Sequence, residues 1–187
     1  MLKLKIIKPT EKELEEFLIE SNAIEDEHSE QALKDAKQAW TTGVVNFKKD
    51  FSIDLILAIH RRLAKNINKE IAGKIRTVPV YVGNRYEYRE CLKPELIHER
   101  LTKLIESWNN NYEELKEMSK EDKEVFIKNW HVDFEHVHPH LDINGRTGRI
   151  IMNLQRLSVG LKLLTIHVGI EQQNYYKWFR EKTTIPK

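Results

Sequence analysis

"HVHPHLDINGRTGRI", residues 136–150, joins two segments whose apolar residues recur at helical spacing. In the segment before it, apolar and aromatic residues repeat at intervals of one, three and four. Pro139 ends this pattern, because a proline disfavours the helical conformation of the residue before it. A second stripe of isoleucine and leucine then runs from Ile150 to Leu157 and stops at Gly160. The sequence therefore predicts two helices joined by a short polar loop.

The polar loop contains side chains suited to acid–base and metal chemistry. His138 is a candidate general base, because a neutral imidazole accepts protons near pH 7. Asp142 offers a hard oxygen ligand of the kind that Mg²⁺ prefers. A lone His-Pro pair, or a lone pair of arginines, would favour a plain polar loop in which backbone groups satisfy His138 and Asp142. Their combination with the residues that follow argues against that alternative.

The start of the second helix has the composition of an anion site. Asn144 and Gly145 lead into a helix N-terminus, where free N–H groups and the positive end of the dipole attract phosphate. Arg146 and Arg149 are three residues apart and project from one side of the first turns. Because two arginines there oppose the helix dipole unless an anion is present, their position predicts a polyphosphate site.

The composition limits the class of protein. The chain of 187 residues is 40% hydrophobic and 32% charged, which is typical of a helix-rich globular protein. A net charge of +2 provides no global field for nucleic acid, so we expect no direct nucleic-acid binding. No window approaches 18 uninterrupted apolar residues, so we expect no membrane span. Cys91 is the single cysteine and the N-terminus lacks a signal-peptide pattern, so we expect a cytoplasmic protein.

Cap residues and apolar spacing predict further helices. Thr10 and Glu13 form a capping-box pattern that predicts a helix over residues 10–24. Ser52 is expected to cap another helix, and Ser119 to begin the helix before the loop. The other expected helices cover residues 29–40, 94–108 and 171–181, with the asparagine run after Trp108 as a break.

Residues 73–88, "GKIRTVPVYVGNRYEY", interrupt the helical rhythm. They are rich in valine, tyrosine and threonine and contain Gly-Asn, which predicts a β-hairpin or an extended flap. Pro79 indicates that at least one strand lies at an edge. The expected fold class is therefore all-α, mainly helical, with one small β-hairpin flap.

Residues 138–149, "HPHLDINGRTGR", also resemble the motif of the Fic family (filamentation induced by cAMP), His-Pro-Phe-x-Asp-Gly-Asn-Gly-Arg-x-x-Arg. The matching residues are His138, Pro139, Asp142, Asn144, Gly145, Arg146 and Arg149. The runs "LAIHRRLA" and "GKIRTV" look like features of the same family, and the resemblance covers roughly residues 10–180. It implies a single Fic-like domain over residues 1–187, with an N-terminal inhibitory helix at 1–28, the flap at 73–88 and a catalytic helix-loop-helix at 120–160.

The resemblance implies a protein adenylyltransferase, which transfers AMP from ATP to a hydroxyl group of a target protein. His138 would then deprotonate the target's serine, threonine or tyrosine, and Asp142 would hold Mg²⁺. The phosphates of ATP would be bound by Asn144, Gly145 and Arg146, with Arg149 on the γ-phosphate. The implied cofactors are ATP and Mg²⁺.

The resemblance also implies how a target is held. Thr77, Val78 and Val80 of the flap would hold a segment of the target protein by strand addition. An ordinary surface hairpin is the alternative. Tyr175 or Tyr176 is a weaker candidate for an aromatic contact with adenine. The implied partners are ATP and a target with an exposed serine, threonine or tyrosine, and a homo-oligomer is compatible with the sequence.

Two residues depart from the motif. Ile143 stands where the family has glycine, and a β-branched residue is strongly disfavoured if that position needs a positive φ. His140 stands where the family has phenylalanine, so it either packs into the core as a neutral ring or loosens the loop. The alternative function is therefore a catalytically weak or inactive Fic-fold module that binds nucleotide or regulates.

The first helix contains a second candidate motif, "SNAIED", residues 21–26. On a helical wheel Ser21 and Glu25 extend the apolar stripe, and a carboxylate that faces inward needs a positive partner. The alternative is that the helix ends near Ile24 and Glu25 lies in water. The segment is similar to the Fic inhibitory motif, Ser/Thr-x-x-x-Glu-Gly/Asn, with Asp26 in the last position. This similarity implies that Glu25 pairs with Arg149 and blocks productive ATP binding.

The histidines around the loop raise a metal alternative. Four histidines lie within residues 131–140, but their spacing is poor for shared ligation and no H-E-x-x-H pattern is present. We therefore expect no dedicated zinc site.

Overall fold

The computed structural model describes residues 7–47, 51–83 and 88–180. In chain order the elements are α1 (Glu11–Ala23), α2 (Glu30–Asn46), α3 (Ile53–Ala64), β1 (Tyr81–Gly83), β2 (Tyr88–Glu90), η1 (Pro94–Leu96), α4 (Ile97–Glu117), α5 (Lys120–Val137), α6 (Asn144–Ser158), α7 (Ile170–Lys177) and η2 (Trp178–Arg180). The fold is mainly helical with one small antiparallel hairpin, so the predicted class is confirmed.

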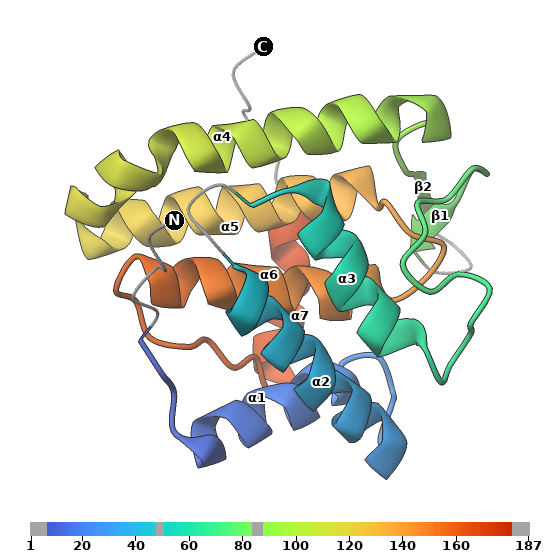
Figure 1. Ribbon diagram of the computed structural model, residues 1–187, viewed down its shortest axis with the longest axis horizontal. Helices are drawn as coiled ribbons and strands as arrows, with labels where there is room; N and C mark the ends of the chain where they lie inside the picture. The colour runs from blue at the N-terminus through green and yellow to red at the C-terminus, as the bar shows by residue number, and fades with distance from the viewer. Residues whose placement is uncertain (1–6, 48–50, 84–87, 181–187) are drawn as a thin grey trace.

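The helices α5 and α6 pack against each other, and the loop at residues 138–143 joins them (Figure 1). Helix α4 lies along α5, the α2–α3 pair packs on α6, and α1 lies across α2 and α6. Buried side chains such as Trp108, Phe134 and Ile150 form one apolar cluster between these helices. The loop lies at the end of the α5–α6 pair that is nearest the hairpin.

Cap residues begin the helices in three of the expected places. Thr10 and Glu13 form a complete capping box, in which the Thr10 N–H donates to the Glu13 carboxylate at 2.8 Å. The side chains of Ser29 and Ser119 each accept a backbone N–H of the helix that follows. Ser52 is the N-cap residue of α3, as predicted, but its side chain makes no cap hydrogen bond. Helix α3 forms through its buried apolar face instead.

Helix α4 is longer than predicted. The helix expected to end at Trp108 continues to Glu117, so the break predicted at the asparagine run 109–111 is wrong. Tyr112 and Leu115 are buried together with Trp108. Burial of this face outweighs the weak helix propensity of asparagine.

Two other helices differ at their C-terminal ends from the sequence expectation. Helix α2 continues past Trp40 to Asn46, and its last turns bury Gly43. Helix α7 ends at Lys177 and is followed by the 3-10 turn η2.

The hairpin begins later than predicted. Tyr81 pairs with Glu90 in a two-stranded antiparallel sheet, whereas residues 73–80 run without regular strand pairing. Pro79 lacks an N–H, which explains why the first strand starts after it. The predicted Gly-Asn turn falls on residues 83–84, and residue 84 lies outside the described residues. Across the described ranges, no helix is long and apolar enough to cross a membrane.

Candidate functional site

His138 is the C-cap residue of α5 and has a left-handed backbone, with φ 49° and ψ 64°. Its N–H donates to the Phe134 carbonyl at 3.0 Å, which holds the residue on the last turn of α5. Burial lowers the pKa of His138 to about 4, against a smaller opposing effect of the Glu135 carbonyl. The imidazole is therefore neutral at pH 7 and can accept a proton.

Arg76, which the sequence did not single out, ties the base of the flap to the end of α5. Its side chain is buried, its backbone N–H donates to the Pro139 carbonyl at 2.9 Å, and its Nε donates to the His138 carbonyl at 2.7 Å. Its Nη1 and Nη2 donate to the carbonyls of Val78 and Leu92. One guanidinium thus satisfies several carbonyls that would otherwise be free. The only signal for Arg76 in the sequence was the resemblance of the run "GKIRTV".

His140 is fully buried and stacks on His60 of α3, with ring centroids 3.7 Å apart and planes 3° from parallel. His140 Nδ1 lies 2.8 Å from the Lys74 carbonyl and donates to it. The Gly73 N–H donates to His60 Nδ1 at 2.9 Å. Burial lowers the pKa of His60 to about 4 and that of His140 to about 3, so both rings are neutral at pH 7. The stacked pair fastens the loop to α3 and to the base of the flap.

Ile143 has a positive φ, the backbone conformation that is strongly disfavoured for a β-branched residue. It is the N-cap residue of α6 with φ 64° and ψ 19°, a conformation that β-branched residues rarely adopt. Its side chain is 4% exposed and belongs to the apolar cluster. The neighbouring Asp142 is exposed, and its Oδ1 accepts the Ile143 N–H at 2.6 Å. The side chain of Ile143 is thus buried behind the loop, while the carboxylate of Asp142 lies on its solvent side.

Asn144 shapes the loop with both ends of its amide. Its Oδ1 accepts the His140 N–H at 2.9 Å, and its Nδ2 donates to the His140 carbonyl at 3.0 Å. The side chain is buried, so the amide predicted to bind phosphate is committed to the backbone of the loop. Its contribution to an anion site is therefore to fix the position of the α6 N-terminus.

Arg146 places a guanidinium group at this N-terminus, and one of its N–H donors has no hydrogen-bond partner in the described part of the chain. Its side chain is 7% exposed, and Nε is buried with no hydrogen-bond partner among the described residues. Burial lowers its pKa, and the charges of Glu25 and Asp142 oppose that change. A buried guanidinium with an unused donor favours a negative ligand beside it.

Arg149 is buried and held mainly by α1. Its Nε donates to Ser21 Oγ at 2.9 Å, and its Nη2 donates to the Ser21 carbonyl and to Glu25 Oε1, each at 2.8 Å. Its Nη1 lies 3.5 Å from the Tyr175 hydroxyl. Burial would lower the pKa of Arg149, but Tyr175 and Glu25 outweigh this effect and raise it. The structure thus brings both predicted inhibitory residues onto the second arginine of the loop motif.

The turn after α1 directs Glu25 to Arg149. Helix α1 ends at Ala23, so the helical-wheel argument for Glu25 is wrong and the expectation that the helix ends near Ile24 is correct. The Glu25 side chain is nevertheless paired, although it is 38% exposed. Asp26 has φ 57°, a left-handed conformation that aspartate tolerates better than most residues. Asp26 therefore adopts a left-handed turn at the position where the inhibitory motif has glycine or asparagine.

Gly145 allows this carboxylate to lie against the first turn of α6. A Cβ at this position would lie 2.5 Å from Glu25 Oε1 and 2.9 Å from Arg149 Nη1. Glu25 therefore occupies the space where the helix N-terminus and the arginine would receive an anion.

The two candidate tyrosines differ in their surroundings. Tyr175 is buried, and its hydroxyl lies 2.8 Å from His131 Nε2 and close to Arg149. Tyr176 is 43% exposed, and its hydroxyl accepts from Gln172 Nε2 at 3.2 Å. Tyr175 thus supports Arg149, while Tyr176 offers the more accessible ring.

The predicted docking residues lie in the segment before β1. Thr77 and Val78 are exposed, and the Val80 carbonyl accepts the Cys91 N–H at 3.0 Å. The segment therefore continues toward the hairpin with its first residues accessible.

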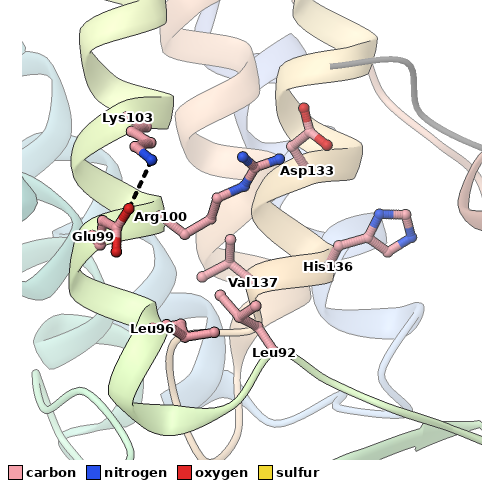
Figure 2. A pocket seen from close by; sticks show the side chains of 8 residues that line it. All are labelled: Leu92, Leu96, Glu99, Arg100, Lys103, Asp133, His136 and Val137. Atoms are coloured by element: carbon pink, nitrogen blue, oxygen red, sulfur yellow. Dashed lines mark hydrogen bonds and ion pairs between the residues drawn. The ribbon is translucent and has the colours of Figure 1, made fainter. Parts of the chain in front are cut away.

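A separate cavity of about 380 Å³ lies between α4 and α5 (Figure 2). Leu92, Leu96 and Val137 form its apolar part, and Arg100 and His136 are among its polar residues. It does not include any of the site residues predicted from the sequence. Among the residues placed by the structure, no group of three His, Cys, Asp or Glu side chains could hold a metal ion.

A family model described as the Fic/DOC family matches residues 50–155, which is more than half of the chain. The protein adenylyltransferase fic-1 of Caenorhabditis briggsae is 33% identical over 126 residues, 67% of this chain and 23% of that protein. The protein adenylyltransferase Fic of Aedes aegypti is 28% identical over 162 residues, 82% of this chain and 28% of that protein. The chain therefore belongs to the Fic/DOC family, and it spans about a quarter of the length of these curated relatives.

Two solved structures have the same fold. Fic-1 (aa134 - 508) from C. elegans matches with a TM-score of 0.68 and 20% identity, covering 90% of this chain and 55% of that one. A Fic domain containing signaling protein from Bacteroides thetaiotaomicron matches with a TM-score of 0.71 and 16% identity, covering 95% and 75%.

Proposed function

We propose that this protein is a protein adenylyltransferase that transfers AMP from ATP to a hydroxyl group of a target protein, and that Glu25 inhibits it. The observation that carries the proposal is the buried Arg149 beside the α6 N-terminus, held by Glu25 where an anion would bind. The names of the curated relatives support the same activity.

In the proposed reaction the hydroxyl oxygen of the target attacks the α-phosphorus of ATP. His138 takes the hydroxyl proton, a new oxygen–phosphorus bond forms, and pyrophosphate leaves. His138 suits this step because burial keeps its ring neutral, and Arg76 holds its carbonyl in place. Phosphate transfer depends mainly on positioning and charge, which the α6 N-terminus, Arg146 and Arg149 supply.

Asp142 is the residue that would hold Mg²⁺. Its carboxylate is exposed in front of the α6 N-terminus, and one oxygen is oriented by the Ile143 N–H. Mg²⁺ commonly uses one or two carboxylates together with substrate phosphates, so a single aspartate fits this ion. The bound ion would neutralise phosphate charge during transfer.

The target would dock on the segment of Thr77, Val78 and Val80, and Tyr176 is the better placed of the two tyrosines to contact adenine. Cys91, the single cysteine, is buried and free, which fits a reducing compartment such as the cytoplasm.

A labelling experiment tests the proposal. The Glu25→Gly variant, incubated with Mg²⁺ and ATP tagged on its α-phosphate, should label itself or added protein more strongly than the unaltered chain. Label should vanish in Glu25→Gly/His138→Ala and should stay at the basal level in Glu11→Gly, which changes an exposed acid in the first turn of α1. ATP binding without label in Glu25→Gly would instead favour a non-catalytic nucleotide-binding module.

A further inference from the structure

Glu135 is a buried acid that the reaction proposed above does not use. It lies on α5, one turn before His138, and is 7% exposed. Its Oε1 is buried and has no hydrogen-bond partner among the residues described. An unpartnered carboxyl group is costly to bury, so its retention beside an active-site helix needs an explanation.

Two glycines bring two carboxyl groups onto one helix. A Cβ at Gly148 would overlap Glu135 Oε1, just as a Cβ at Gly145 would meet Glu25 Oε1. Gly145 and Gly148 are three residues apart, so they are neighbours on the α6 surface. Glu25 approaches α6 from the turn after α1 and Glu135 approaches it from α5; Arg149 donates to Glu25, and its charge also acts on Glu135.

The surroundings of Glu135 favour its neutral form. Burial raises the pKa of Glu135 to about 8, the charge of Glu25 adds to the rise, and Arg149 and Arg89 oppose it. Two close carboxyl groups cannot both ionise without a large cost, so one holds a proton. Glu25 is ion-paired with Arg149, which leaves Glu135 as the neutral partner at pH 7.

We propose that Glu135 is a further residue of the anion site, which takes up a proton whenever an anion lies beside Arg149. This inference rests on the proposed function, because the anion that replaces Glu25 is taken to be the polyphosphate of ATP. A phosphate there repels an ionised Glu135 as Glu25 does. Where Glu25 is absent, as in the Glu25→Gly variant, ATP binding is therefore coupled to the uptake of one proton from solvent by the Glu135 carboxylate.

The other groups around Glu135 do not titrate between pH 7 and 9. Burial lowers the pKa of His131 to about 3, and His138 has a pKa of about 4. Burial also raises the pKa of Tyr175 and that of the Cys91 thiol above their usual values. Arg149 and Arg89 stay positively charged, because a guanidinium is not deprotonated at these pH values. A loss of ATP affinity between pH 7 and 9 therefore reflects deprotonation of the Glu135 carboxyl group.

The test measures ATP affinity by calorimetry, with Mg²⁺ present, in the Glu25→Gly variant at pH 7, 8 and 9. We expect the affinity to fall roughly tenfold between pH 7 and 9, because one linked proton sits on a carboxyl group whose pKa is about 8 when an anion lies beside Arg149. Glu135→Gln, which keeps the shape and stays neutral, should remove the fall in the Glu25→Gly background. Glu121→Gln, an exposed acid on the same helix, should leave the fall unchanged.

Glu135→Ala provides a second neutral variant if the glutamine variant does not fold, and thermal melting checks both. The inference is overturned if affinity does not depend on pH, if both neutral variants keep the full dependence, or if Glu25→Gly does not bind ATP at pH 7. Labelling that persists while the pH effect is absent rejects only the inference. A pH-linked affinity without labelling rejects only the transfer reaction.

Discussion

Positions 140 and 143 both depart from the family motif, yet the protein accommodates them by different means. His140 is buried with a parallel ring from His60 and a hydrogen bond from its Nδ1 to the Lys74 carbonyl, although its Nε2 has no partner among the described residues. Ile143 keeps a left-handed backbone, and its buried side chain offsets that cost through apolar contact. At position 140 a different side chain can thus be accommodated by a new packing partner. At position 143 the positive φ stays the same whichever side chain is present. Both residues anchor the loop from behind and leave its solvent side open.

The largest effect is expected from removing the ring at position 140. His140→Ala should lower the free energy of unfolding by about 2 to 4 kcal/mol, because it leaves a cavity beside His60 and an unpaired Lys74 carbonyl. His140→Phe restores the ring but not the hydrogen bond, so it should lose less. Urea unfolding measures both. A loss below about 0.5 kcal/mol for the alanine variant, which is typical of a surface substitution, would show that the stacked ring pair does not stabilise the loop.

Acid should weaken the same anchor. The pKa of His60 is lowered to about 4 and that of His140 to about 3, whereas an unfolded histidine titrates near 6.5. The unfolded chain therefore binds more protons, and stability is complete above about pH 6.5 and is lost as the pH falls toward 4. At pH 5 each ring should cost about 2 kcal/mol.

The pH effect has its own control. His131 and His138 contribute to the same loss, so urea midpoints at pH 7, 6 and 5 should fall in every variant. In the His140→Phe variant the urea midpoint should fall less between pH 7 and 5, because one titrating histidine has been removed. Equal slopes in the two proteins would mean that His140 is not buried as a neutral base.

Two substitutions at position 143 should separate the free-energy cost of the positive φ from the loss of the buried side chain. Ile143→Ala and Ile143→Gly both lose the buried side chain, but only glycine relieves the left-handed strain. The glycine variant should therefore be more stable than the alanine variant by about 1 kcal/mol, the reverse of their order in ordinary helical positions. Denaturant unfolding of the pair measures this difference, and an alanine variant equal to or more stable than glycine would contradict the positive φ.

The smallest effect is expected at Asp26, which shares the left-handed conformation. Asp26→Gly should change the free energy of unfolding by only a few tenths of a kcal/mol, because aspartate tolerates this region. A gain of 1 kcal/mol or more in the same unfolding assay would show that aspartate is as strained there as Ile143.

Local patterns predicted much of this molecule. The capping box of Thr10 and Glu13 and the end of α5 before Pro139 were readable because neighbouring residues determine them. The contacts of Arg76 with the end of α5 were not readable, because they join residues about 60 positions apart. Such contacts leave no spacing pattern to detect.

Two local predictions were wrong. Asparagine propensity suggested a break after Trp108, and the buried face of α4 overrode it. The helical wheel assumed that Glu25 was helical, but the helix ends at Ala23, and the turn that follows it directs the carboxylate to Arg149. The pairing partner was therefore predicted correctly, but the geometry that produces it was not.

Glu25, and not Ile143, is proposed to close the nucleotide site. The direct measurement is the affinity for ATP with Mg²⁺ of the unaltered chain, Glu25→Gly and Ile143→Gly at pH 7. We predict that Glu25→Gly binds at least about tenfold more tightly, since the buried Arg149 loses its partly exposed partner Glu25 and becomes free to bind phosphate. Ile143→Gly should stay within about threefold of the unaltered chain. Tight binding by Ile143→Gly together with no gain in Glu25→Gly would contradict the claim.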